Sequence, residues 1–299
     1  MATLSLKSNQ TLMPFIAFWV LGVIWGSNFI YMKLAVELIS PMQVLLYRVF
    51  FGFVPVFLYA RAKGVLKLEH LKYSHHFIIM SLLATTVYYY GFVKGTSLLL
   101  SGVAGAVSGA IPLFTFILGI VFIPEEKATL KKATGIVIGF AGVLMIALQS
   151  GHDIMSSNLI GVLYISAGAL CLGASFVYAK NFVMPLKLPA AALTTYQLGF
   201  GLIELLVVTK YQGLGNVFTD MHSAIGLILG LGLLGTGLAY IIYYYLVERL
   251  GAVSASSVTY LPPVVALLIG AFIVGEPISL TSYAATAMIF AGVFLLKKR

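Results

Sequence analysis

The stretch GSNFIYMK at residues 26–33 comes back at residues 173–180 as GASFVYAK. Gly, Phe, Tyr and Lys keep their places across an offset of 147 residues. Further matches follow in the same order at offsets of 149 and 150, among them Tyr47 with Tyr196, Tyr90 with Tyr240, and residues 140–143 with residues 290–293. An ordered series at nearly one spacing indicates an internal duplication.

The composition places both copies in a membrane. Of the 299 residues, 61% are hydrophobic and 9% are charged, whereas a soluble domain carries about 25% charged residues. Apolar runs of roughly 20 residues, the length that crosses a hydrocarbon core, recur along the whole chain. Ten spans are predicted, near residues 12–35, 41–60, 75–93, 98–122, 131–149, 159–180, 190–210, 223–246, 251–274 and 279–296.

Lysine and arginine are unevenly distributed about these spans. With ten spans both termini lie on one side, and 14 of the 18 Lys and Arg residues fall on that side. Lys33, Lys94 and Lys210 fall on the other side, and Arg48 lies within a span. Because cytoplasmic loops carry the excess of positive charge, both termini are predicted to be cytoplasmic. Membrane orientation thus explains the net charge of +9, and no nucleic-acid partner is expected.

Each copy holds five spans, so the second copy enters the membrane from the opposite side. The predicted fold class is an all-α membrane protein of ten transmembrane helices, built as two inverted five-helix repeats around a central cavity. Inverted repeats are a recurrent transporter design, because exchanging their conformations opens a central site to each side in turn. A purely structural duplication is the alternative. The predicted divisions are a cytoplasmic segment at 1–11, a first repeat at 12–149, an external linker at 150–158, a second repeat at 159–296 and a cytoplasmic tail at 297–299.

Tyrosines within the spans are the first candidates for a substrate site. Thr236, Tyr240 and Tyr244 are spaced i, i+4, i+8, which places them on one helix face, and Thr86 and Tyr90 repeat the pattern in the first copy. Aromatic rings with hydroxyl tips suit a planar or partly apolar solute. Packing of these tyrosines in an aromatic core is the alternative reading.

Asn28 and its counterpart Ser175 add hydrogen-bonding groups near mid-membrane, and Trp25 precedes the first of them. A hydrogen bond between helices is the structural alternative for Asn28. The complete set of predicted substrate-binding residues is Trp25, Asn28, Thr86, Tyr88, Tyr90, Ser108, Ser175, Tyr178, Thr236, Tyr240, Tyr244 and Tyr260.

Prolines occur in mid-span at equivalent positions of the two copies. Pro112 lies in the fourth span, and Pro262 and Pro263 lie in the ninth. Each proline removes an intrahelical hydrogen bond and can kink its helix. Small residues precede both sites, so the two helices are predicted either to be hinged walls of a cavity or to form close-packed interfaces.

Arg48 and Glu204 are the charged residues that lie well inside spans. An ionisable residue in a span is a functional candidate by default, and both lie at similar depth, roughly 9 to 10 Å from a helix end. They are predicted to form an ion pair or to face an outer vestibule, with a role in coupling. The alternative is that each extends toward the headgroups.

No enzymatic constellation is found in the sequence. The five histidines fall in loops or at span ends, Cys171 has no partner thiol, and there is no zinc-peptidase or phosphate-loop motif. Neither a metal site nor a cofactor is expected, and the chain is predicted not to be an enzyme. An intramembrane enzyme acting on lipid is a distant alternative.

The whole chain resembles the ten-helix EamA-type members of the drug/metabolite transporter superfamily. The resemblance rests on Trp25 with residues 26–29, on Pro112 and Pro262, and on a turn with Gly275-Glu276-Pro277. The first repeat has Pro124-Glu125-Glu126 where the family usually has Gly-Glu, which leaves the geometry of that turn open. Members are similar in being multi-pass carriers of the bacterial inner membrane, many of them metabolite or amino-acid exporters.

Within that family, the aromatic lining and the scarcity of fixed charge resemble the aromatic amino-acid exporters of the YddG type. The resemblance implies export of small organic solutes, with amino acids or related metabolites and the lipid bilayer as the partners and with a monomeric chain. The competing expectation is a multidrug or cationic metabolite exporter of the same fold. That exporter would need a buried acid, for which Glu204 is the candidate.

Overall fold

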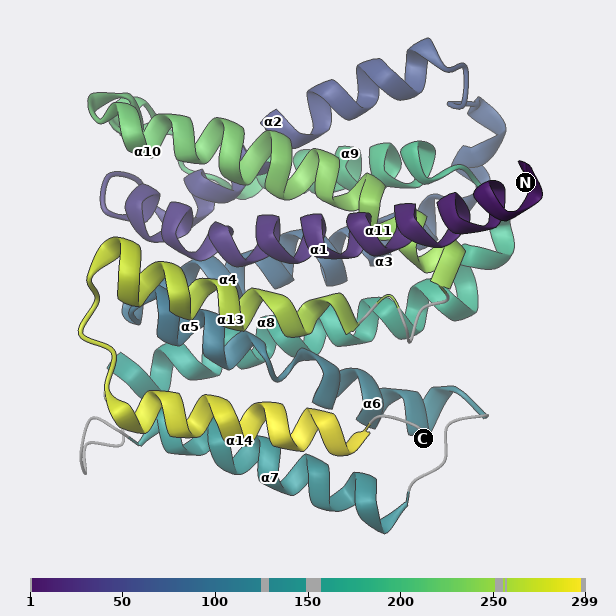
Figure 1. Cartoon of the computed structure of the whole chain (residues 1–299). Coiled ribbons are helices and arrows are strands. Elements are labelled where there is room, and N and C mark those ends of the chain that lie inside the picture. Colours follow the sequence, from purple (N-terminus) through teal and green to yellow (C-terminus); the bar gives the residue numbers. More distant parts are fainter. Residues whose placement is uncertain (1, 125–128, 149–156, 251–254, 256, 297–299) are drawn as a thin grey trace.

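The computed structural model describes residues 2–124, 129–148, 157–250, 255 and 257–296. Within these ranges all secondary-structure elements are helices, and the helices lie side by side as a bundle (Figure 1). Among the described residues, nine helical segments are long and apolar enough to cross a membrane: Met13–Val36, Pro41–Ala62, Leu68–Leu98, Ser101–Phe122, Leu130–Ala147, Asn158–Leu186, Ala190–Val208, Met221–Leu246 and Ser257–Val274. The shorter apolar helix Leu280–Leu295 makes the tenth. The prediction of an all-helical membrane protein with ten spans is confirmed.

Several spans are composite. The third consists of the 3₁₀ segment η1 (Leu68–Tyr73), α3 (Ser74–Ser81), the π-helical segment η2 (Leu82–Thr86) and α4 (Val87–Leu98). The fourth divides into α5 (Ser101–Ser108) and α6 (Ile111–Phe122). The eighth joins α10 (Met221–Ile225), the π-helical segment η6 (Gly226–Leu238) and α11 (Ala239–Leu250). The ninth joins the 3₁₀ segment η7 (Ser257–Tyr260), α13 (Leu261–Leu268) and the π-helical segment η8 (Ile269–Val274).

The sixth span joins α8 (Ser157–Tyr178), the π-helical segment η3 (Ala179–Val183) and the 3₁₀ segment η4 (Met184–Leu186). The remaining spans are α1 (Ala2–Val36), α2 (Pro41–Ala62), α7 (Leu130–Ala147), α9 (Ala190–Val208) and α14 (Leu280–Leu296). Because α1 is helical from Ala2, the segment predicted to precede the first span continues the same helix. The turn at residues 125–128, the linker at 149–156 and the tail at 297–299 lie outside the described residues.

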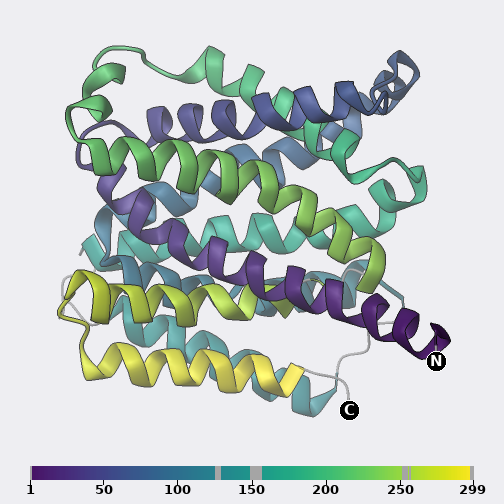
Figure 2. The ribbon, with the colours of Figure 1, turned by 45° about the horizontal axis from the view of Figure 1, so that its top comes forward.

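The two repeats interlock across the bundle. Helix α2 packs against η6 and α9, α4 packs against α8, and α1 packs against α13. The last spans of the two repeats, α7 and α14, pair with each other along one edge of the bundle (Figure 2). Glycines allow this close approach, because a Cβ on Gly292 would lie 2.6 Å from the Gly139 nitrogen.

The face of the bundle at which α1 begins is here named the terminal face, and the opposite one the distal face (Figure 1). At the distal face Glu276 accepts hydrogen bonds from the backbone N–H groups of Ser101 (2.8 Å) and Gly102 (2.9 Å), which open α5. At the terminal face the Tyr178 hydroxyl lies 2.7 Å from His76 Nδ1. All three bonds join one repeat to the other, so the repeats are tied together at each end.

Candidate substrate pocket

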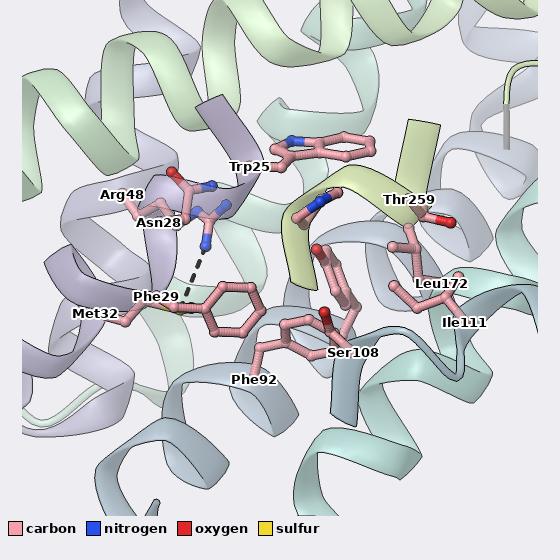
Figure 3. Close-up of a pocket in the computed structure, with 12 residues that line it drawn as sticks. Trp25, Asn28, Phe29, Met32, Arg48, Phe92, Ser108, Ile111, Leu172 and Thr259 are labelled. Carbon is pink, nitrogen blue, oxygen red and sulfur yellow. Dashed lines mark hydrogen bonds between the residues drawn. The ribbon is translucent and has the colours of Figure 1, made fainter. Parts of the chain in front are cut away.

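A small pocket lies where the two repeats meet (Figure 3). The first repeat contributes α1, α2, α4, α5 and α6, and the second contributes α8, η7 and α13. Its volume is about 20 Å³, enough for one water molecule. The lining residues are Trp25, Asn28, Phe29, Met32, Arg48, Tyr88, Phe92, Ser108, Ile111, Leu172, Thr259 and Pro262.

The fourth and ninth spans, which carry the mid-span prolines, both reach the pocket. The fourth span breaks at residues 109–110, between α5 and α6, and Pro112 stands in the first turn of α6. Because proline has no N–H, Pro112 cannot donate to the carbonyl of Ser108, the residue four positions earlier. In the ninth span, Pro262 and Pro263 occupy the first turn of α13. The prolines predicted from the sequence therefore mark helix starts beside the pocket, and their hinge role stays a prediction.

Arg48 projects from α2 and is 1% exposed. Its Nε donates to Thr236 Oγ1 (2.9 Å), and its Nη2 donates to the carbonyl of Gly235 (3.3 Å). The guanidinium carbon stacks 3.6 Å from the centre of the Tyr89 ring. Nη1 points at Met32 Sδ, 3.8 Å away (Figure 3), which is a weak acceptor. The cation is thus held from one side by η6 and from another by an aromatic face.

The Asn28 side-chain amide completes this group. Its hydrogen bonds are satisfied when its nitrogen donates to the Ile24 carbonyl and its oxygen accepts from Arg48 Nη2, both at 3.1 Å. The predicted polar residue of the first span therefore lies in the pocket. There it accepts a hydrogen bond from Arg48, the charged residue predicted in the second span.

Glu204 lies elsewhere, so the predicted ion pair is wrong. Its two carboxylate oxygens accept hydrogen bonds from Ser81 Oγ (2.6 Å) and Thr86 Oγ1 (2.5 Å). Within the described part of the chain, Arg48 has no carboxylate at ion-pair distance. Two side chains at equal depth in the membrane need not meet, because each also points in its own direction around its helix.

The tyrosines of the eighth span are also bound by protein groups. The Tyr240 hydroxyl donates to the carbonyl of Ala84 in η2. The Tyr244 hydroxyl donates to Gln197 Oε1 (2.6 Å), and Gln197 Nε2 donates to Thr85 Oγ1 (2.9 Å). Neither tyrosine is in the pocket lining. Buried hydroxyls require partners, and here α9 and η2 supply them, which is the core-packing alternative weighed from the sequence.

Among the predicted substrate-binding residues, four line the pocket: Trp25, Asn28, Tyr88 and Ser108. The other eight are outside the lining. Three of them bind protein groups through their hydroxyls: Thr236 accepts a hydrogen bond from Arg48, Thr86 donates one to Glu204, and Ser175 donates one to the carbonyl of Leu172. Tyr90 contacts the Tyr164 ring edge-on, Tyr178 contacts His76, and Tyr260 directly precedes α13. Tyr240 and Tyr244 are bound as described above.

Apolar lining residues were not predicted. Phe29 and Met32 share a helix face with Trp25 and Asn28, at the spacing i, i+3, i+4, i+7. Phe92 follows Tyr88 by one turn. Helical periodicity around the predicted residues would have identified Phe29, Met32 and Phe92 as further lining residues. Leu172, Ile111 and Thr259 carry no such signal.

An inverted pair of five-helix repeats that share a pocket at their interface defines a membrane transporter. The chain belongs to the EamA-like transporter family, whose profile matches it twice, over residues 12–148 and 159–297. The two matches fall on the two repeats.

Relatives of known sequence carry transporter names. The chain is 28% identical over 276 residues to the "Uncharacterized transporter YoaV" of Bacillus subtilis, covering 91% of this chain and 92% of that protein. It is 27% identical over 301 residues to the "Uncharacterized inner membrane transporter YedA" of Escherichia coli K12, covering 97% and 92%. A solved crystal structure superposes with a TM-score of 0.60 at 18% identity, over 96% of this chain and 95% of that one, and supports the fold.

Proposed function

We propose that this transporter exports small organic solutes, most of all aromatic amino acids, across the bacterial cytoplasmic membrane by alternating access. The supporting observation is the composition of the pocket. Four aromatic rings, those of Trp25, Phe29, Tyr88 and Phe92, stand beside the amide of Asn28 and the guanidinium of Arg48. A pocket with apolar walls and few fixed polar groups is typical of a site for a small organic molecule.

The size of the pocket supports a closed state. A volume of about 20 Å³ is far below the roughly 300 Å³ at which ligand pockets begin. An amino acid therefore enters after the repeats move apart. The break beside Ser108 and the start of α13 at Pro262 lie at the pocket, and two of the contacts that tie the repeats together lie at the two faces. Opening one face at a time would expose the pocket to each side in turn.

The proposed direction follows from orientation. The excess of Lys and Arg on the side of the termini supports a cytoplasmic terminal face and an external distal face. Export is then uptake of cargo at the terminal face and release at the distal face.

The test of function is uptake into liposomes that contain the purified protein. Labelled L-phenylalanine, L-tyrosine, L-leucine and L-alanine are offered, together with the organic cation tetraphenylphosphonium. The proposal expects saturable uptake of the aromatic amino acids. Uptake of the cation alone would favour the multidrug alternative.

Trp25→Ala is expected to raise the half-saturating concentration of L-phenylalanine about 2- to 13-fold, since one aromatic contact contributes about 0.5–1.5 kcal/mol. Trp19→Ala is the matched control, because Trp19 lies on the same helix but is 47% exposed on the outside of the bundle. Concentration dependence of uptake measures both variants. Equal shifts in the two would contradict a substrate role for Trp25.

Proton coupling is proposed to involve Glu204. A carboxyl within the membrane that is bound by two hydroxyl groups can bind and release a proton during a cycle. Glu204→Gln is expected to abolish the response of uptake to an imposed pH gradient while uptake without the gradient persists. If the pH response is unchanged in Glu204→Gln, the proton is carried elsewhere or not at all.

A further inference from the structure

We infer that Arg48 is the binding site for a carboxylate group of the cargo. The inference rests on the proposed function and deepens it, because it names the chemical group by which the pocket would select its ligand. It is carried by an uncompensated positive charge that lies fully buried in the pocket wall.

The charge of Arg48 is permanent, and its partners among the described residues are neutral. A guanidinium stays protonated in proteins. Its partners here are a hydroxyl, a carbonyl, an amide, a thioether and an aromatic ring, and in the part of the chain that the structure describes no carboxylate pairs with it. Burying an ion without a counter-ion is strongly unfavourable. An anionic group on the ligand would compensate this buried charge, which explains why an arginine is present at this position.

The donors of Arg48 are unequally occupied. Nε and Nη2 point at strong acceptors, on Thr236, Gly235 and Asn28. Nη1 points only at Met32 Sδ, at 3.8 Å. Both Arg48 and Met32 line the pocket, which favours this poorly satisfied edge of the guanidinium as the one that a ligand would reach. Stacking on Tyr89 fixes the plane of the guanidinium, which a carboxylate could then meet in its own plane.

The other lining residues indicate which further charges and groups the ligand can carry. Arg48 is the only cationic residue in the described lining, which suits one carboxylate better than a phosphate with two charges. The described lining contains no acidic residue, so an ammonium group would be met by neutral acceptors. The ligand class is therefore a monocarboxylate with an apolar or aromatic body, as a zwitterion or a simple acid.

The experiment compares three probes that share a phenyl ring and differ in charge: L-phenylalanine, 3-phenylpropionate and 2-phenylethylamine. Each is titrated into the purified full-length protein, and the thermal unfolding temperature is followed. The two carboxylates are expected to stabilise the protein and the amine is not. Arg48→Gln is expected to weaken the apparent affinity for both carboxylates by about 10- to 100-fold. Arg61→Gln is the matched control, an arginine of the same helix that is exposed.

A second variant keeps the arginine. Met32→Glu places a carboxylate beside Nη1, where it should occupy the site permanently. The protein is expected to unfold at the same or a higher temperature than the wild type and to stop responding to both carboxylates. Met32→Gln, of similar size and neutral, is expected to keep the response. This pair of variants gives a result even if Arg48→Gln does not fold.

The outcomes separate this inference from the proposed function. Stabilisation by 3-phenylpropionate that depends on Arg48, with no uptake of any amino acid, would support the carboxylate site and refute amino-acid export. Stabilisation by 2-phenylethylamine alone would overturn the carboxylate site. So would carboxylate affinities within threefold of the wild type in Arg48→Gln or in Met32→Glu.

Discussion

Gly292→Val is expected to leave little folded protein. A Cβ at this position would lie 2.6 Å from the nitrogen and 2.7 Å from the Cα of Gly139, and both are backbone atoms that cannot rotate away. Overpacking in a well-packed core costs about 1–3 kcal/mol. Here α7 and α14 would have to separate along their contact. The yield of monodisperse protein after extraction and its thermal unfolding temperature measure the effect.

Gly215→Val is the control for this prediction. Gly215 has no atom within 4 Å of an added Cβ and lies outside the membrane-crossing helices. The same substitution there should leave yield and unfolding temperature close to the wild type. An unfolding temperature of Gly292→Val equal to that of Gly215→Val would show that the pairing of α7 with α14 is not as tight as the structure has it.

Glu276→Ala is expected to open the distal face. Both oxygens of Glu276 bind the N-terminus of α5 across the repeat boundary. Hydrogen bonds to a charged group contribute about 1.5–3 kcal/mol each. A net loss of about 2 kcal/mol would shift the equilibrium toward the distally open state roughly 30-fold. Among the ties between the repeats, this one joins a carboxylate to a helix start, where the helix dipole favours negative charge.

Thiol labelling measures that opening. Ser108→Cys in a Cys171→Ala background places the single thiol in the pocket lining. An impermeant thiol reagent is added outside intact cells, and labelling is expected to be faster when Glu276→Ala is present. Glu69→Ala is the control, because Glu69 pairs with Lys67 in an exposed ion pair at 3.3 Å near the other face. Equal labelling rates in the two variants would contradict the role of Glu276 in closure.

Much of the fold was predictable because it depends on patterns that need no partner. Span length follows from apolar runs, and inversion follows from five spans in each copy. The break in the fourth span and the change from 3₁₀ to α-helix in the ninth lie beside Pro112 and Pro262, because proline removes a helix hydrogen bond wherever it stands. Trp25 and Asn28 were predicted for the pocket from the duplicated motif and lie in it.

The partners of the buried polar groups were not predictable in the same way. Helical spacing showed that Tyr240 and Tyr244 share a face, but whether that face meets a pocket or another helix depends on how the helices are rotated in the bundle. The structure turns it toward η2 and α9. Likewise, depth suggested a pair between Arg48 and Glu204, whereas Arg48 points to η6 and the pocket.

The central claim is that the two repeats carry an amino acid through the pocket they share. Counterflow tests it most directly: liposomes that contain the protein are loaded with unlabelled L-phenylalanine, and entry of external labelled L-phenylalanine is followed. The account predicts a transient accumulation that needs both the internal load and an intact Arg48, and that persists in Arg61→Gln. Entry no faster than into protein-free liposomes, for every amino acid tested, would contradict it.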